Sequence, residues 1–270
     1  MYSEKELIGQ LNAMNVPRDG IVLMHSSLRC IGEVEGGGEA VLDLLIRYFT
    51  EKGGLFCVPT PTVRNLLDGK EITLDMNSAE NDLGVLSKLA AMRTDGIRSE
   101  NPLLSMVVFG DRARAEAFVR DDAFITTPTA KESCYGKLAT WGGYILLVGV
   151  GHEKSTYLHS VAELLDMEDR MDTEEQRVGV KRLSGEIILR KMRLYKCSKT
   201  IDVSRRFPKY EIAFRYHGGI VDGFFGDAPV QFCDAKIMKD TVSYILQNSG
   251  GEDPLGTDLQ IPPIWFCKKK

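Results

Sequence analysis

The side chains of this 270-residue chain best suited to acid–base chemistry are a histidine and a glutamate four residues apart. His159 and Glu163 belong to the segment GYILLVGVGHEKSTYLHSVAELLDM, in which an apolar strand pattern is followed by glycines and a helical pattern. Residues four apart share one side of a helix, within side-chain reach. A neutral imidazole accepts a proton from an attacking nucleophile, and a carboxylate bound to it stabilises the imidazolium that forms.

The helix that carries this pair is expected to start at the edge of a sheet, with Ser155 or Thr156 as its N-cap. Its buried face is predicted to consist of Leu158, Val161, Ala162 and Leu165. Ligand crevices of α/β sheets lie outside the carboxyl ends of the strands, where such a helix begins. The helix N-terminus favours a neutral His159 and Glu163 favours its cation, so the sequence leaves the balance open. A surface His–Glu pair worth a few tenths of a kcal/mol is the alternative.

The elements that position the pair follow from alternating patterns along the chain. Strands are predicted at 20–24, 55–58, 103–109 and 144–150, and helices at 3–14, 38–51, 83–92 and 111–119. Residues 63–82 are expected to form a long loop, 180–195 a β-hairpin and 233–247 a closing helix. The predicted fold class is α/β: a mixed central sheet covered by helices on both faces, with a C-terminal β-hairpin and closing helix, in one domain of residues 1–270.

Composition excludes several classes of protein. The net charge of −4, with 43% apolar and 27% charged residues, is ordinary for a soluble globular protein and does not favour nucleic acid as a partner. No apolar run approaches the ~20 residues that cross a bilayer, so no membrane partner is expected. The N-terminal segment has an amphipathic helix pattern unlike a signal peptide, which predicts the cytoplasm. The oligomeric state, monomer or homodimer, stays open.

Metal and nucleotide motifs are absent from the sequence. The six cysteines, at positions 30, 57, 134, 197, 233 and 267, form no CxxC pair, and we expect small buried thiols in a reducing compartment. The chain has no GxGxxG, GxxxxGK[ST], HExxH or GxSxG motif. His152 and Glu153 could join His159 around a metal, but without a recognisable spacing. We therefore expect no metal cofactor.

Two charged stretches allow two interpretations each. Residues 163–175 hold seven acidic side chains and one arginine, which would attract a polycation or form a solvated helix end and loop. The predicted hairpin carries five basic residues, which would meet coenzyme phosphates or line an exposed strand face: Lys181, Arg182, Arg190, Lys191 and Arg193.

Five segments, in order, resemble the aminoglycoside 3-N-acetyltransferases. VLMHSSLRCIGEVEGGGEAVLDLLIRYFTEKGGLFCVPT is similar to the family's N-terminal pattern of HSSL, a glycine, a GG pair, a helix and a PT dipeptide. Four further segments follow in the family's order: GIRSENPLLSMVVFG, TPTAKESCYGKL, LLVGVGHEKSTYLHSVAE and GDAPVQFCDAKIMKD. The matches span residues 22–245, most of the chain.

The resemblance implies acetyl transfer from acetyl-CoA to an amine, such as the 3-amino group of an aminoglycoside, without a metal or a covalent enzyme intermediate. His159 would be the general base, oriented by Glu163. The implied coenzyme contacts are His25, Ser26, Ser27, Leu28, Gly32 and Ser105, and the implied acceptor contacts are Thr156, Asp166 and Asn101.

Two positions depart from the family pattern. Asn101 stands where the family's RSxHP segment has its histidine, and Ala162 stands where many members have the helix carboxylate, so that Glu163 is the nearest substitute. Two other functions stay open. One is a serine hydrolase that uses Ser26 or Ser27 with His159 and Glu163, and the other is a catalytically silent protein that binds coenzyme A.

Overall fold

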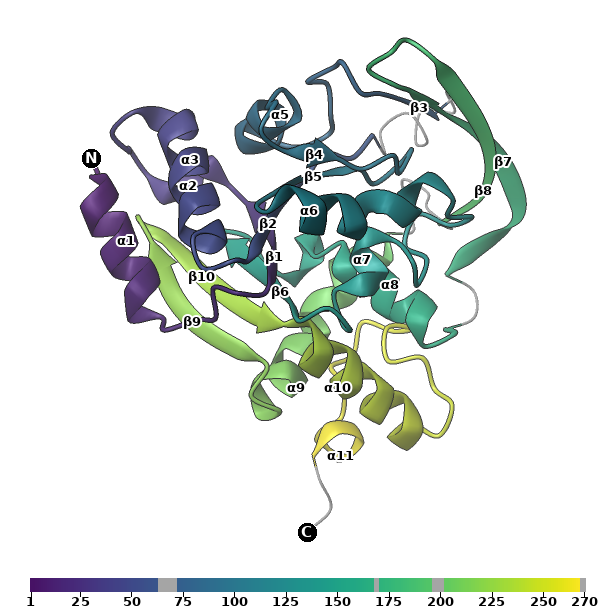
Figure 1. The fold of residues 1–270 in the computed structure, drawn as a ribbon. Helices are drawn as coiled ribbons and strands as arrows, with labels where there is room; N and C mark the ends of the chain where they lie inside the picture. The colour runs from purple at the N-terminus through teal and green to yellow at the C-terminus, as the bar shows by residue number, and fades with distance from the viewer. Residues whose placement is uncertain (63–71, 168–169, 196–201, 268–270) are drawn as a thin grey trace.

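The computed structural model describes residues 1–62, 72–167, 170–195 and 202–267 (Figure 1). The strands are β1 Ile21–Ser26, β2 Leu55–Pro59, β3 Ile72–Asp75, β4 Ile97–Arg98, β5 Met106–Phe109, β6 Gly143–Val148, β7 Met171–Lys181, β8 Ile187–Tyr195, β9 Ile220–Phe225 and β10 Ala228–Asp234. The α-helices are α1 Glu4–Ala13, α2 Leu28–Ile31, α3 Gly37–Thr50, α5 Val85–Ala91, α6 Arg112–Val119, α7 Cys134–Lys137, α8 Tyr157–Leu164, α9 Glu211–Tyr216, α10 Ala235–Asn248 and α11 Pro263–Phe266. Three 3₁₀ helices are η1 Arg120–Ala123, η2 His152–Lys154 and η3 Val203–Tyr210.

The central sheet has seven strands in the order β4–β5–β2–β1–β6–β10–β9. β1 pairs in parallel with β2 and β6, and the strands outside this trio pair antiparallel. This confirms the predicted mixed α/β sheet. The parallel trio brings the carboxyl ends of β1, β2 and β6 to the same edge of the sheet, where Ser26 lies opposite Val148.

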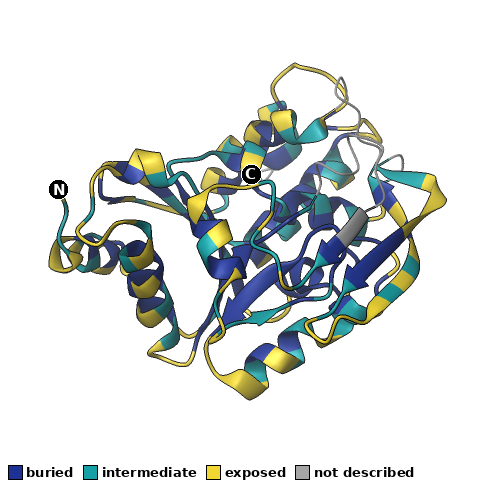
Figure 2. Cartoon of the chain, turned by 90° about the horizontal axis from the view of Figure 1, so that it is seen from above, coloured by how far each residue is buried: buried dark blue, intermediate teal, exposed yellow. Residues whose placement is uncertain are grey.

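Alternate residues of the central strands pack into two separate cores. On β1, Ile21 and Leu23 face the core built with α6, α7, α8 and α10, whereas Val22 and Met24 face the core built with α1, α3 and α5. The sheet is therefore covered by helices on both faces, as predicted, and Figure 2 shows its strands dark blue between helices with yellow outer faces. Strand alternation also places His25 on the α7–α8 face.

Local signals explain where the N-terminal helices begin. Ser3 and Glu6 form a capping box at the start of α1, an arrangement worth about 1 kcal/mol. Gly36 and Gly37 have φ of 76° and 64°, the left-handed region that glycine enters without a Cβ clash. Two residues of the triple glycine thus make the turn into α3, whose predicted span of 38–51 agrees with the observed helix.

The small second sheet contains strand residues that the sequence patterns missed. The hairpin predicted at 180–195 is β7–β8, but β7 begins at Met171, and the parallel strand β3 extends the pair into a three-stranded sheet. The acidic stretch 163–175 is therefore partly strand, and the loop prediction for 63–82 is wrong at Ile72–Asp75. Residues 63–71 of that loop lie outside the described part of the chain.

Candidate functional site

His159 lies in the first turn of α8 with its imidazole between two aromatic rings. The Tyr195 ring of β8 lies 4.6 Å from the imidazole, centroid to centroid, at an interplanar angle of 36°. The Phe207 ring of η3 lies 4.9 Å away, edge-on at 71°. Three elements that are far apart in sequence therefore enclose the imidazole, which stays partly exposed.

Desolvation decides the protonation of this imidazole. The pKa of His159 is lowered to about 4, mainly by desolvation, with Asp202 raising it and the positive charge of Arg170 lowering it by smaller amounts. Burial thus outweighs the two opposing influences considered from the sequence, the helix N-terminus and the charge of Glu163. His159 is neutral at pH 7 and can accept a proton.

The Glu163 carboxylate faces buried hydroxyl groups. Thr127 donates a hydrogen bond to Oε1, and Thr129 donates one to Oε2 at 2.9 Å. Among the described residues, no hydrogen bond joins Glu163 to His159. The spacing of four residues put both side chains on one helix, as predicted, but the carboxylate is held by the segment before α7.

A small cavity of about 10 Å³, barely enough for one water molecule, borders His159. It is lined by residues of α8, η3 and α10 together with Met167, Arg170 and Leu255. Of the predicted buried face of α8, Leu158, Val161 and Ala162 are buried and Leu165 is half-buried. Thr156 is the N-cap residue, although its side chain makes no capping hydrogen bond.

The HSSL segment leaves the sheet beside the segment that leads to α8. The Ser27 backbone N–H donates to the Val148 carbonyl at 2.9 Å. A Cβ on Gly149, whose φ is 63°, would come within 2.4 Å of the Cys30 Cβ, so only glycine permits this approach. Two segments that the sequence separates by more than a hundred residues therefore meet at the carboxyl edge, as expected for a ligand crevice.

Polar groups without partners gather at this edge. His25 is 6% exposed, its Nε2 has no hydrogen-bond partner, and burial lowers its pKa to about 4. His152 is fully buried with both ring nitrogens unpartnered, and the Ser155 hydroxyl is also buried without a partner. Within the described residues, the hydroxyls of Ser26 and Ser27 have no partner either, and both residues are half-buried. Buried polar groups normally have partners, so these are available to a ligand or to water.

The other predicted contact residues are placed differently. Leu28 packs against the α1–α3 core, and Gly32 is exposed directly after α2. The Ser105 hydroxyl is buried and donates to the Thr60 carbonyl at 2.8 Å. Asp166 is exposed just after α8, at a φ of 48°.

Asn101 is fully buried and has a structural set of hydrogen bonds. Its Nδ2 donates to the Pro128 carbonyl at 2.7 Å, and its Oδ1 accepts from the backbone of Leu103 and Leu104. These bonds hold 102–104 in a turn, which explains why β5 begins at Met106 and not at the predicted 103. Contact between Asn101 and an acceptor stays a prediction. The hydrogen bonds of Asn101 favour a role in holding the backbone around it.

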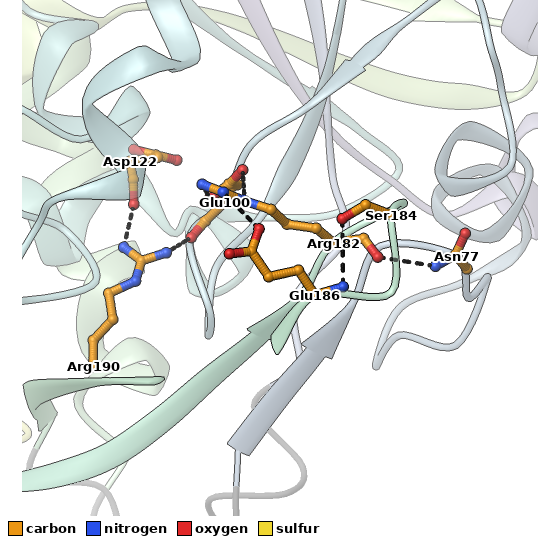
Figure 3. A network of polar contacts seen from close by, with 7 residues as sticks. All are labelled: Asn77, Glu100, Asp122, Arg182, Ser184, Glu186 and Arg190. Carbon is orange, nitrogen blue, oxygen red and sulfur yellow. Dashed lines mark hydrogen bonds and ion pairs between the residues drawn. The ribbon is translucent and has the colours of Figure 1, made fainter. Parts of the chain in front are cut away.

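Most basic residues of the hairpin are engaged within the fold. Lys181 pairs with Asp75 at 2.9 Å, and Arg182 binds Glu100 through two nitrogens. Arg190 donates to the backbone carbonyls of Glu100 and Asp122 (Figure 3). Lys191 and Arg193 are exposed, which agrees with the interpretation that the basic residues line an exposed strand face.

Several classes of site are not found in the described residues. No group of three or more His, Cys, Asp or Glu side chains there is placed to hold a metal ion. None of the helices described combines the length and apolar character that crossing a bilayer requires. The free thiols of Cys57, Cys134 and Cys233 are buried, as predicted for small hydrophobes, whereas Cys30 is exposed.

Comparison with known proteins decides the family. The profile of the aminoglycoside 3-N-acetyltransferases matches residues 23–247, which contain every residue considered above as a site residue. The chain belongs to the aminoglycoside 3-N-acetyltransferase family. This confirms the resemblance seen in the five ordered segments.

Individual relatives agree with the family. The chain is 29% identical over 164 residues to aminoglycoside N(3)-acetyltransferase IV of a Salmonella species, across 61% of this chain and 59% of that protein. The matches to the curated relatives span about three fifths of the length of each of them.

Solved structures share the fold. AAC(3)-IVa, as a histidine-to-alanine variant in complex with a gentamicin, superposes with a TM-score of 0.75 at 21% identity and covers 99% of this chain and 94% of its own. AAC-IIIb in a binary complex with CoASH also gives 0.75, at 20% identity, covering 94% of this chain and 99% of its own.

Sequence reasoning missed the residues that surround His159. Tyr195, Phe207 and Asp202 come from segments 36 to 48 residues further along the chain, and only the fold brings them together. Thr129 lies within TPTAKESCYGKL, a segment noted for its resemblance, but nothing in the pattern indicated that it binds Glu163.

Proposed function

We propose that this protein is an acetyl-CoA-dependent N-acetyltransferase that acylates the 3-amino group of an aminoglycoside antibiotic or a similar amine, and so confers antibiotic resistance. The observation that carries the proposal is the family match over residues 23–247. Solved structures of this fold are named as complexes with a gentamicin, apramycin and CoASH, which supports both substrates of the reaction.

In the proposed reaction, His159 is the general base. The amine nitrogen attacks the thioester carbonyl, a C–N bond forms, and the C–S bond to coenzyme A breaks. The attacking nitrogen becomes acidic as the bond forms, and the neutral imidazole takes its proton. A pKa of about 4 keeps His159 unprotonated at pH 7, and the departing thiolate takes up a proton in turn.

The carboxyl edge of the sheet is the proposed coenzyme side. Ser26 and Ser27 offer unpartnered hydroxyls there, and the His25 Nε2 atom is buried without a partner. Such groups suit the amide and phosphate oxygens of coenzyme A. Leu28 begins α2 and Gly32 follows its end, while Ser105 would shape the edge through the hydrogen bond that its hydroxyl donates to the Thr60 carbonyl.

The acceptor side would lie along α8 and the start of η3. Asp166 is exposed just after the C-terminal end of α8, Thr156 is the N-cap at its other end, and Asp202 acts electrostatically on His159 from the start of η3. Carboxylates attract a polycationic amine and leave the coenzyme phosphates to the opposite side of the base. Glu163 contributes its charge, although its oxygens are held by threonines.

The serine-hydrolase alternative lacks support in the described residues. A triad needs a serine on one imidazole nitrogen and a carboxylate on the other. The imidazole of His159 has no hydrogen bond to Ser26, Ser27 or Glu163 within the described part of the chain, and its neighbours are aromatic rings. The other alternative, a protein that binds coenzyme A without catalysis, is distinguished from the enzyme by the experiment below.

The test is an amine screen with acetyl-CoA that follows release of free thiol. Gentamicin and apramycin should give turnover, and His159→Ala should lower kcat by about 10²- to 10⁴-fold, the usual contribution of a general base, with acetyl-CoA affinity nearly unchanged. His217→Ala is the matched control, because His217 contacts Tyr216, Tyr244 and Phe266, away from α8. Retained turnover in His159→Ala would refute the assigned base, and coenzyme binding without turnover on any amine would favour the silent protein.

A further inference from the structure

The Glu163 carboxylate is connected to the His159 imidazole by an indirect route. Thr129 donates its hydroxyl proton to Oε2 of Glu163 at 2.9 Å, and the same hydroxyl oxygen contacts the Tyr195 hydroxyl at 2.9 Å. The ring of Tyr195 is the one that lies 4.6 Å from the imidazole of His159. Four residues from three segments thus form one continuous chain of contacts.

The direction of this chain is fixed by the proton count of its members. An ionised carboxylate only accepts hydrogen bonds, so Thr129 must direct its single hydroxyl proton to Glu163. The Thr129 oxygen can then only accept from Tyr195, which must keep its phenolic proton. Desolvation raises the pKa of Tyr195 well above its usual value, so the phenol stays protonated over the working pH range.

A second contact ties the same loop to α8. Ser160, the residue after His159, donates its hydroxyl to the Thr129 backbone carbonyl at 3.0 Å. Thr129 is fully buried and Thr127 nearly so, which keeps water from competing for the carboxylate. The loop before α7 therefore holds α8 at Ser160 and at Glu163, in the turn that directly follows His159.

We propose that Glu163 acts on His159 through Thr129 and Tyr195, and that Tyr195 is a positioning residue for the imidazole. The carboxylate orders Thr129, Thr129 holds the phenol, and the ring of Tyr195 fixes and shields the imidazole against Phe207. This arrangement serves the role of a carboxylate orienting the base without a direct bond to it. The proposal rests on the proposed function only in taking His159 as the base.

Other charged and titratable groups near the imidazole also influence the pKa of His159. Asp202 at the start of η3 and Arg170 before β7 act on it electrostatically, Glu163 lies on its own helix, and Tyr210 lines the adjoining cavity. Substitutions at Thr129 or Tyr195 leave Asp202, Arg170 and Tyr210 in place, and they reach Glu163 only through its hydrogen bond to Thr129, which is part of the chain itself. A change in the pKa of His159 in such variants therefore reports the chain of contacts.

The experiment is a proton NMR titration of the His159 Cε1–H signal, assigned by its loss in His159→Gln. Thr129→Val and Tyr195→Phe each break the chain, and both should move the signal and raise the pKa of His159. Tyr195→Leu removes the ring, admits water and should carry the pKa furthest toward 6.5. Thr129→Ser keeps the hydroxyl and should restore the behaviour of the unaltered protein, and Tyr48→Phe, which loses a tyrosine hydrogen bond on the opposite face of the sheet, should change nothing.

Kinetics supply a second measurement. If Tyr195→Leu raises the pKa of His159 to about 6, its kcat/KM relative to the unaltered protein should be about tenfold lower at pH 5 than at pH 8. An unchanged signal and pKa for His159 in Thr129→Val would overturn the proposal, even if the enzyme is active. Absence of acetyl transfer in the unaltered protein would instead refute the proposed function, while the titration would still decide the positioning role.

Discussion

The hairpin and the carboxyl edge of the central sheet treat polar side chains in opposite ways. At the hairpin, Arg182 is bound by Glu100 and Glu186, and Arg190 is bound by two backbone carbonyls (Figure 3). At the sheet edge, the imidazoles of His25 and His152 are buried with nitrogens that have no partner among the described residues. The hairpin engages both guanidinium groups within the fold and leaves Nε of Arg190 as the one nitrogen of the two without a partner among the described residues, whereas at the edge both ring nitrogens of His152 lack one.

The contrast separates structural polarity from polarity kept for a ligand. An unpartnered buried polar group costs about 1–3 kcal/mol, so a fold that keeps several of them together gives up stability there. In the hairpin, ion pairs hold Arg182 and backbone carbonyls hold two of the three guanidinium nitrogens of Arg190. This difference favours the edge over the hairpin as the coenzyme side, although the hairpin is the more basic of the two.

The largest expected effect concerns acid stability and comes from the unpartnered histidines. Burial lowers the pKa of His25 and of His152 to about 4, while the unfolded value is near 6.5. Between these pH values the unfolded chain therefore binds more protons than the folded chain. The free energy of unfolding is highest above pH 6.5 and falls as the pH drops toward 4. Each histidine should cost roughly 2 kcal/mol between pH 7.5 and pH 5.

Urea unfolding at pH 7.5 and pH 5 measures this loss. His152→Asn and His25→Asn cannot titrate there, so each variant should lose roughly 2 kcal/mol less than the unaltered protein over the same interval. His217→Asn is the control, because His217 is only part-buried and one of its ring nitrogens meets the Phe266 carbonyl. Equal losses in all four proteins would show that the edge histidines have partners in solution.

On the hairpin side of the comparison, the expected effect is about as large as that of one histidine and smaller than that of the two histidines together. Arg190→Ala leaves the carbonyls of Glu100 and Asp122 without their donor, in a region where desolvation already lowers the pKa of Arg190. The expected destabilisation is about 1–3 kcal/mol by urea unfolding. Lys191→Ala, at an exposed neighbouring position, should stay within about 0.5 kcal/mol. A loss of the same size in both variants would mean that the network adds nothing beyond the strand itself.

How much of this the sequence predicts depends on the range of the interactions. Strands such as β1 and β6 and helices such as α3 follow from patterns within a few residues, and they were predicted within a few positions. The helix of His159 was predicted for the same reason. The edge strand β9 and its neighbour β10 were missed because exposed and buried residues are mixed along them and neither has a continuous apolar run.

The sequence predicted only the part of the candidate site that lies within a few residues along the chain. The spacing of His159 and Glu163 correctly implied one helix, but it also suggested a direct pair, and the carboxylate turned to Thr127 and Thr129 instead. That choice depends on a loop 34 to 36 residues earlier in the chain and on Tyr195, which follows on a separate strand. Long-range packing of this kind leaves no periodic trace in the sequence, so the partners of Glu163 could not be derived from it.

The smallest expected effect is the ion pair between Arg182 and Glu100. Its geometry is bidentate, at 2.8 and 2.9 Å, but the arginine side chain is 37% exposed and Glu186 offers it a second partner. Solvent and this second partner limit the coupling, so a double-mutant cycle with Arg182→Ala and Glu100→Ala should give about 0.2–1 kcal/mol, less at high salt. A coupling above about 2 kcal/mol, insensitive to salt, would place the pair in a buried environment. The charged groups of the hairpin would then be as shielded from water as the histidines of the sheet edge. The two regions would differ only in whether their polar groups have hydrogen-bond or ion-pair partners.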